Sequence, residues 1–309
     1  MTSFAVLMPN YNHGRYLNEA LDAVLSQKGT DGRLVLVDDG STDDSTSRVQ
    51  AYIDRHGQQF DYIQLPSNQG VIHAMEAVLA TTSEPLFFSI GPDDPVKLGF
   101  FTHSLDMMKC YPKAGLCFSD TTRLFPSGET REVTHHLSDR PCYLTPHAFA
   151  RKIDEQPRFS IATSSCCWRR QPFLDIWDHR LRELRWHYDW FVSLVVAFRH
   201  GVCYIPEAYQ FVRIDPASYS LAGMHSEAQS EVYVTLLELL QDPAYADVKP
   251  FFKIPSILSK FGIEIVNLIE EHPIYHDYLS DRLIELAHQA DEYNHERQRQ
   301  FEYAFKSTE

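Results

Sequence analysis

An apolar run that stops abruptly at two acidic residues constrains the fold of this chain more than any other feature. The run Leu34–Val37 is followed by Asp38, Asp39 and Gly40, and then by a helix-capping cluster at Ser41–Asp44. A buried parallel strand ends in this way when it delivers acidic groups to the rim of an open α/β sheet, where ligands bind. We therefore expect a ligand site at Asp38 and Asp39.

Strand and helix signals alternate over the first 95 residues or so. Four short apolar stretches are expected to be strands: 4–8, 34–37, 62–65 and 85–90. Helical spacing of apolar residues predicts helices at 14–27 and 70–80, and the capping cluster begins another helix between them. The fourth stretch ends at a second acidic pair, Asp93-Asp94. This order predicts an α/β fold with a mostly parallel sheet flanked by helices.

The pattern loosens after this point. Further helices are expected at 100–108 and 186–199, further strands at 115–120 and 202–205, and a loop-rich stretch at 125–157. From about residue 225 the apolar spacing is helical throughout. We therefore expect a main domain at 1–224 and an all-helical extension at 225–309. Packing on the main domain, formation of a homodimer and docking to a membrane surface are the open roles of this extension.

Charge and composition narrow the class of protein. The net charge of −14 argues against nucleic-acid binding, which needs a basic surface, but a small anionic ligand remains compatible with it. The six cysteines form no C-x-x-C pair and are expected to be reduced and mostly buried. No apolar run approaches the roughly 18 residues of a membrane span, and the first residues lack a signal-peptide pattern. A cytoplasmic location is expected, with any membrane contact peripheral.

Several short motifs in the first half of the chain follow one another in a characteristic order. They are Val6–Asn12, Tyr16-Leu17, Glu19–Leu21, Leu25–Gln27, Val37–Asp43, Asn68–Gly70, Ala74 and Asp93-Asp94. Together they resemble the inverting glycosyltransferases of family 2, which have the GT-A fold. The resemblance is strong over residues 3–125 and weaker over 160–220. It implies a nucleotide-sugar donor, most simply a UDP-sugar.

The resemblance assigns donor-binding roles to residues after the first three expected strands. Pro9 and Tyr11 lie at the first strand end, where an aromatic ring can stack on a nucleobase; an ordinary surface tyrosine is the alternative. Asp39 matches the residue that accepts the imide N–H of uracil, whereas its neighbour in the pair more often only holds the turn. Asn68 and Gly70 would let the backbone approach the nucleotide, and simple helix capping is the alternative.

The second acidic pair resembles the DxD motif of the family in a variant form. Gly91 stands where many members carry an earlier aspartate. The resemblance implies that Asp93 contacts the donor ribose and that Asp94 binds a metal. A diphosphate and these acids are all negative, so a divalent cation, Mg²⁺ or Mn²⁺, is expected between them as a Lewis acid. A helix cap is the alternative role of the pair.

The general base is expected in the second half of the chain. Asp189 matches the acidic residue of the family that removes the proton of the acceptor hydroxyl. The flanking Trp186 and Trp190 would desolvate this carboxylate, raise its pKa and suit stacking on a sugar. His187 is an alternative base. The other possibility for Asp189 is that it is a surface residue of an amphipathic helix without a catalytic role.

A late segment, Val212–Ser220, is similar to a family segment in which a histidine helps to coordinate the metal or the diphosphate. Asp215 takes the place of that histidine and is an acceptable hard ligand, so it is expected to bind the metal. Arg213 would either offset phosphate charge or serve as a structural residue. Thr163–Ser165 would line the acceptor pocket.

These features predict a metal-dependent inverting glycosyltransferase. It would move a sugar from a nucleotide donor to a hydroxyl of a glycan or lipid-linked acceptor, as in polysaccharide assembly. A non-catalytic nucleotide-sugar-binding module on the same fold and a nucleotidyltransferase are the alternatives. The sequence contains neither G-x-x-x-x-G-K-[ST] nor G-x-G-x-x-G after the first strand, which argues against kinases, ATPases and dehydrogenases.

Overall fold

A computed structural model describes residues 3–27, 32–156, 159–215, 218–224 and 226–306. The chain divides into two compact units. The first comprises Met1–Tyr143, Ile161–Trp177 and His200–Ile214, and the second comprises Leu144–Ser160, Asp178–Arg199 and Asp215–Glu309. Segments of the two units alternate along the chain. The predicted domain boundary at residue 224 therefore differs from the boundaries of these compact units, and it stays a prediction.

The strands form one mixed sheet. They are β1 (Phe4–Asn10), β2 (Gly32–Asp38), β3 (Asp61–Gln64), β4 (Leu86–Ser89), β5 (Leu116–Leu124), β6 (Thr130–Val133), β7 (Cys142–Leu144), β8 (Cys166–Arg169) and β9 (Val202–Arg213). Their order is β3-β2-β1-β4-β8-β5-β9-β7, with β6 beside β5. Strands β1 to β4 run parallel, as predicted, while β8 is antiparallel to both β4 and β5.

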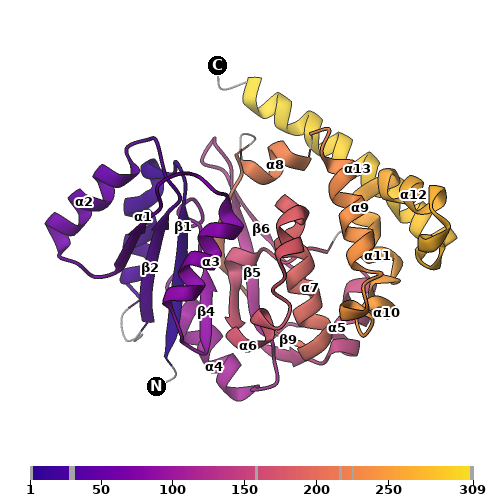
Figure 1. The fold of residues 1–309 in the computed structure, drawn as a ribbon, viewed down its shortest axis with the longest axis horizontal. Helices are drawn as coiled ribbons and strands as arrows, with labels where there is room; N and C mark the ends of the chain where they lie inside the picture. The colour runs from indigo at the N-terminus through magenta and orange to yellow at the C-terminus, as the bar shows by residue number, and fades with distance from the viewer. Residues whose placement is uncertain (1–2, 28–31, 157–158, 216–217, 225, 307–309) are drawn as a thin grey trace. The chain divides into compact units, whose positions relative to one another are not determined.

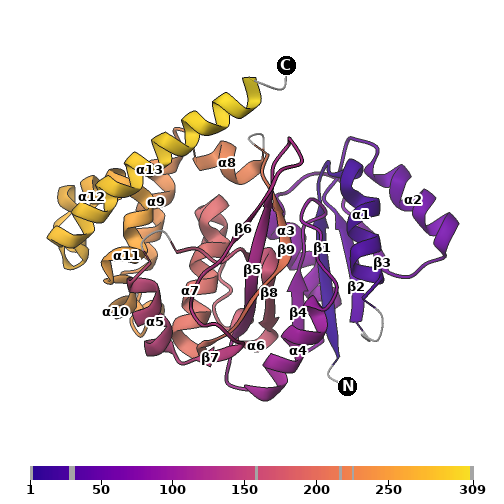
Figure 2. The same ribbon diagram turned by 180° about the vertical axis from the view of Figure 1, so that it is seen from behind.

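Helices cover both faces of the parallel strands. Those of the first unit are α1 (Gly14–Leu25), α2 (Ser45–His56), α3 (Val71–Thr81), α4 (Phe100–Cys110), η1 (Thr163–Ser165) and α6 (Arg170–Leu174). The two opposite views show α1 and α3 on opposite faces of the sheet (Figures 1 and 2). The predicted α/β class is therefore confirmed in this unit.

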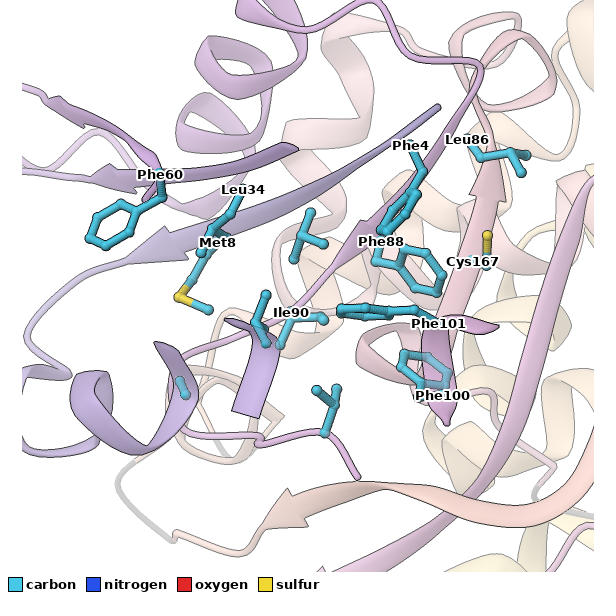
Figure 3. Packing of buried hydrophobic residues seen from close by; sticks show 14 of the residues in the cluster. Phe4, Met8, Leu34, Phe60, Leu86, Phe88, Ile90, Phe100, Phe101 and Cys167 are labelled. Atoms are coloured by element: carbon cyan, nitrogen blue, oxygen red, sulfur yellow. The ribbon is translucent and has the colours of Figure 1, made fainter. Parts of the chain in front are cut away.

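An aromatic cluster fixes the parallel strands to the helices on one face. Phe4 of β1 and Phe88 of β4 pack edge to face with their ring centroids 5.6 Å apart. Phe100 and Phe101 of α4 lie 5.2 and 4.6 Å from the Phe88 ring (Figure 3). Burial of each ring stabilises the unit by about 1.5–3 kcal/mol. This core fixes β1 and β4 against α4.

The stretch from 125 to 157 is more ordered than expected. It contains β6, β7 and helix α5 (Pro146–Asp154); Pro157 lies outside the described residues. The hydroxyl of Thr145 accepts the N–H of Ala148, and Pro146 occupies the first helical turn. These are strong helix-start signals, and the expectation of a loop-rich stretch missed the helix that they begin.

The second unit is helical. It holds α5, η2 (His179–His187), α7 (Tyr188–His200), α8 (Tyr219–Met224), α9 (Gln229–Leu239), η3 (Pro243–Tyr245), α10 (Lys249–Phe252), α11 (Pro255–Leu258), η4 (Ser259–Phe261), α12 (Gly262–Glu271), η5 (Pro273–Tyr278) and α13 (Asp281–Lys306). Helices α12 and α13 lie side by side (Figure 1). The described part of 226–306 contains helices and no strand, as predicted. Among the described helices none is both long and apolar enough to cross a bilayer.

Candidate active site

The loop between β1 and α1 contacts both acidic turns of the first unit. Oδ1 of Asn12 accepts the N–H of Thr42 at 2.8 Å and that of Asp43 at 3.2 Å. Nδ1 of His13 lies 3.6 Å from Oδ1 of Asp93, in the turn after β4. One loop reaches both turns because β1 lies between β2 and β4 in the sheet. The two predicted acidic turns therefore share one edge of the sheet.

The first acid after β2 holds the turn together. Asp38 is fully buried; its Oδ2 accepts the Nδ2–H of Asn10 at 2.8 Å, and its Oδ1 accepts the N–H of Ser41 at 2.7 Å. Gly40 has a φ of 68°, and a Cβ there would lie 2.5 Å from the backbone of Ser67. Only glycine fits this position without strain. Asp38 is thus a structural residue, as the sequence suggested for one member of the pair.

Asp39 holds the loop that precedes α3. Its Oδ1 accepts the N–H of Gln69 at 3.0 Å and its Oδ2 accepts that of Gly70 at 2.8 Å. Oδ1 of Asn68 also accepts the Gly70 N–H, at 2.9 Å. Three residues predicted for the donor site therefore lie together: Asp39, Asn68 and Gly70.

The remaining donor-site candidates lie at the end of β1. Pro9 pairs with Val37 in the parallel register of β1 and β2. The next candidate, Tyr11, follows the strand, and 39% of its surface is exposed. That exposure leaves its ring accessible at the rim that carries Asp39, as stacking on a nucleobase would require.

The second acidic turn is bonded to elements far along the chain. Oδ1 of Asp94 accepts the backbone N–H of Arg213 at 2.8 Å, and Oδ2 accepts the hydroxyl of Ser164 at 3.1 Å. The side-chain amide of Gln210 donates to the carbonyl of Asp94. These bonds join the turn to β9 and to η1. Ser164, expected in an acceptor pocket, contacts the acidic pair.

Arg213 is tied to the protein by several contacts. Its Nε donates to the carbonyl of Asp93 at 3.1 Å, and its Nη2 donates to Oε2 of Glu19 at 3.2 Å. The guanidinium carbon lies 4.3 Å from the centroid of the Tyr16 ring. This environment supports the structural reading of Arg213, which links the end of β9 to α1 and to the acidic turn.

The acidic pair fits a divalent cation. Loss of hydration, and secondly the charge of Asp93, raise the pKa of Asp94 to about 8, although the N–H and charge of Arg213 and the Ser164 hydroxyl partly oppose the rise. Two adjacent carboxylates that repel each other suit an ion that completes its coordination with phosphate oxygens. Among the described residues no three acidic, histidine or cysteine side chains form a closed metal site.

Asp189 and Asp215 belong to the second unit, whereas the acidic rim belongs to the first. Asp189 lies in the first turn of α7, where its Oδ1 accepts the N–H of Trp190 at 2.7 Å. Asp215 follows β9, and its carbonyl accepts the N–H of Ser218 at 2.9 Å. The next two residues of that segment, 216 and 217, lie outside the described part of the chain.

Two expectations for the residues around Asp189 were wrong. Trp190 is only 3% exposed and packs edge-on against Phe261, with the ring centroids 4.8 Å apart. It is therefore a core residue that cannot stack on a sugar. His187 is equally buried, and burial lowers its pKa to about 3, so it is too weak a base to rival Asp189. Trp186 stays half-buried.

Two residues of this site had no signal in the sequence. His13 and Gln210 contact the acidic pair, but they come from distant segments of the chain. Neither stands at a spacing that marks a ligand site. Only the pairing of the strands shows that they converge.

A mixed sheet flanked by helices, with acidic turns gathered at one edge of its parallel strands, is the arrangement of GT-A glycosyltransferases. Residues 5–177 match the model of the family described as glycosyl transferase family 2. Because this stretch is more than half of the chain, the protein belongs to that family, as its motifs predicted.

Curated relatives of the chain are distant. An uncharacterized protein of Mycobacterium bovis is 27% identical over 214 residues, which are 68% of this chain and 58% of that protein. An uncharacterized glycosyltransferase of Nostoc sp. is 33% identical over 133 residues, 43% of this chain and 36% of the relative. The chain thus matches little more than half the length of the first of them.

Solved structures share the fold at low sequence identity. TarS of S. aureus in complex with UDP-GlcNAc has a TM-score of 0.62 and 15% identity, and the match covers 95% of this chain and 92% of that one. The mannosyltransferase PcManGT from Pyrobaculum calidifontis, in complex with GDP-Man and Mn²⁺, has a TM-score of 0.53 and 13% identity, covering 88% and 75%. These likenesses confirm the predicted GT-A fold.

Proposed function

We propose that this glycosyltransferase moves a sugar from a UDP-linked donor to a hydroxyl of a glycan or lipid-linked saccharide, with inversion in a single displacement. The β1–α1 loop carries this proposal: Asn12 bonds to the turn after β2 and His13 approaches Asp93 in the turn after β4. A nucleoside diphosphate has a base at one end and a charged diphosphate at the other. The two turns offer suitable groups for both ends.

The base of the donor would lie at the turn after β2. The ring of Tyr11 would stack on it, and the carboxylate of Asp39 would accept the imide N–H of uracil. The same part of the donor site would be lined by the backbone of Pro9, Asn68 and Gly70. The bound UDP-GlcNAc of the TarS structure supports a uridine donor, whereas the GDP-Man of PcManGT shows that the fold alone leaves the base open.

Asp93 would contact the ribose, and Asp94 would bind Mg²⁺ or Mn²⁺ together with phosphate oxygens of the donor. When bound, the cation would offset the negative charge that develops on the departing diphosphate. The Mn²⁺ in the PcManGT structure supports a divalent ion. Asp215 remains a proposed ligand on the resemblance of its segment to the family.

Asp189 would act as the general base. Its carboxylate would take the proton of the acceptor hydroxyl while that oxygen forms a bond to the anomeric carbon and the bond to the diphosphate breaks. The position of Asp189 in the first turn of α7, with an oxygen on the Trp190 N–H, fixes the carboxylate at the helix start. The role itself rests on the resemblance of this segment to the family.

The acceptor would belong to the assembly of a surface polymer. A teichoic acid poly(glycerol phosphate) polymerase of Staphylococcus epidermidis is 29% identical over 94 residues, 30% of this chain and 13% of that protein. Together with the expected cytoplasmic location, this favours a saccharide acceptor met at the inner face of a membrane by peripheral contact. The helical C-terminal segment would provide that contact or a homodimer interface.

Turnover of nucleotide sugars tests the proposal. The purified protein is given a panel of UDP-sugars with Mn²⁺, with and without a chelator, and release of UDP is measured in the presence of saccharide acceptors. We expect Asp189→Asn to lower kcat by about 100-fold or more, and Asp94→Asn to abolish the dependence on Mn²⁺. Asp44→Asn is the matched control, because Asp44 is an exposed acid paired with Arg48.

Undiminished transfer by Asp189→Asn would remove this residue from the base role. Unchanged turnover in chelator would remove the cation. Turnover with GDP-linked donors alone would contradict the assignment of uridine.

A further inference from the structure

The turn that precedes Asp189 adopts an unfavourable backbone conformation. Arg185 has φ 47° and ψ −116°, a region that residues with a side chain rarely occupy. Such strain costs roughly 1–3 kcal/mol and persists only where the surrounding structure enforces it. Three segments of the second unit, α8, α9 and η4, pack against residues 186–190 that follow this turn.

Gln229 of α9 bridges two residues of the turn. Its Oε1 accepts the indole N–H of Trp186 at 2.5 Å. Because an indole nitrogen can only donate, this contact fixes the orientation of the amide, and Nε2 of Gln229 then faces Nε2 of His187 at 2.9 Å. His187 must accept this hydrogen bond, so its ring is neutral. The pKa of His187, lowered by burial to about 3, agrees with that state.

Segments α8 and η4 close the remaining sides of the turn. A Cβ at Gly223 would overlap the ring of Trp186, so only glycine permits this approach. Phe261 of η4 packs edge-on against both His187 and Trp190, with ring centroids 5.0 and 4.8 Å apart. The position of the first turn of α7 therefore depends on helices that follow residue 218.

Lys260 of η4 brings a positive charge to the same place. Its Nζ lies 5.0 Å from the centroid of the Trp190 ring and 5.3 Å from that of Phe261. Loss of hydration lowers the pKa of Lys260 to about 8, while the charge of Asp189 opposes this change. The ammonium group thus lies over the ring of Trp190, the residue that follows Asp189 in the chain, and its charge and that of Asp189 act on each other.

We propose that the C-terminal helices complete the general-base centre, with Gln229 fixing the turn before Asp189 and Lys260 supplying the positive charge that keeps its carboxylate ionised. A desolvated carboxylate holds its proton unless a cation lies nearby, and a general base must begin the reaction ionised. Both are positioning residues, because they act through Asp189. The inference rests on the proposed base role of Asp189.

Other titratable groups also act on this centre. Burial and, secondly, the charge of Asp189 raise the pKa of Tyr188, and burial raises the pKa of Tyr219, so both tyrosines stay neutral below alkaline pH. On the solvent side Arg185 pairs with Glu231 at 3.3 Å. Farther groups on α12 and α13, Glu264 and Asp291, act on Tyr233, whose ring stacks on that of His187. Lys260 is the group here whose charge changes near neutral pH.

The test is the pH profile of kcat/KM for UDP-sugar transfer in the full chain, measured from about pH 6 to about pH 9. We expect Lys260→Met to lower kcat about tenfold and to move the acidic limb up by about one pH unit, because Asp189 loses a nearby cation. Lys260→Arg should return the acidic limb to its wild-type position. It should also remove any fall in kcat/KM near pH 8, since a guanidinium stays charged. Gln229→Leu should lower kcat with an unchanged KM for the donor.

Lys253→Met is the matched control, because Lys253 pairs with the exposed Asp277. Its profile should equal that of the wild type. Circular dichroism and the thermal midpoint identify any variant that is unfolded. If Lys260→Met does not fold, the comparison of Lys260→Arg with the wild type still tests the role of the Lys260 charge. If Asp189→Asn is inactive while Lys260→Met and Gln229→Leu keep the wild-type kcat and pH profile, this inference fails alone. Full activity of Asp189→Asn would overturn the proposed base and this inference together.

Discussion

The role of each acidic residue at the rim of the sheet depends on the groups that its two carboxylate oxygens contact. Those of Asp38 are used by Asn10 and by the turn itself, and the residue is completely buried. Asp39 accepts two backbone N–H groups, yet a carboxylate has about four acceptor positions and can take a further donor. Both acids of the pair therefore stabilise backbone turns, and Asp39 retains acceptor capacity for the proposed donor.

Replacement of Asp39 by asparagine should cost both stability and UDP affinity. An amide can accept only one of the N–H groups from Gln69 and Gly70 and turns its own NH₂ toward the other. We expect a loss of about 1–3 kcal/mol in the free energy of unfolding, together with weaker UDP binding. Urea unfolding and titration calorimetry measure the two effects. Asp44→Asn should change neither; equal effects in both variants would contradict the account of Asp39.

At the scale of elements, the parallel half of the sheet could be predicted from the sequence. Strands β1, β2 and β4 are apolar runs that end at polar turns, and α1 and α3 show helical periodicity. Strand β8 was not predicted, and its antiparallel pairing with β4 and β5 has no local signal. Asp39 directly follows β2, and Asp93 and Asp94 lie in the turn after β4, so the strand ends pointed to all three as candidates.

The contacts between elements could not be predicted in the same way. Asp94 and Arg213 are 119 residues apart in sequence, and Ser164 and Asp94 are 70 apart. The residues next to either partner in the sequence do not indicate such a bond. The burial of Trp190 could not be predicted for the same reason, because it packs against Phe261, which lies far along the chain. Local patterns show where a strand ends, but its neighbours depend on the whole topology.

The link from β9 to the acidic turn depends on the guanidinium of Arg213. Arg213→Met removes its bonds to the Asp93 carbonyl and to Glu19, and also removes a positive charge beside Asp94. We expect a loss of about 2 kcal/mol in unfolding free energy and weaker binding of UDP. Arg131→Met is the control, because Arg131 forms an exposed pair with Glu129. Wild-type UDP affinity in Arg213→Met would show that the turn does not need this link.

At the scale of the whole molecule, the two units divide the proposed work. The first carries the acidic rim for the donor, and the second carries Asp189 with the helices that hold it. Each unit also contains a buried histidine that stays neutral. His135 in the first has a pKa of about 4 and His187 in the second about 3, both lowered mainly by desolvation.

These histidines should make stability fall in acid. Their folded pKa values lie below the ordinary 6.5, so between pH 6.5 and about 4 the unfolded chain binds protons that the folded chain does not. Each should lower the unfolding free energy by about 1.4 kcal/mol per pH unit in that window. His187→Gln should reduce this slope by one histidine's share in urea unfolding. An unchanged slope would mean that His187 is protonated in the folded protein.

We propose that the acids after β2 and β4 bind one nucleoside diphosphate and its cation. A crystal grown with UDP and Mn²⁺ would show this binding, because anomalous scattering locates the metal. We expect Mn²⁺ within about 2.5 Å of an Asp93 or Asp94 carboxylate oxygen, the diphosphate beside it, and uracil at Tyr11 and Asp39. Mn²⁺ bound away from both acids, or a nucleotide seated elsewhere on the chain, would contradict it.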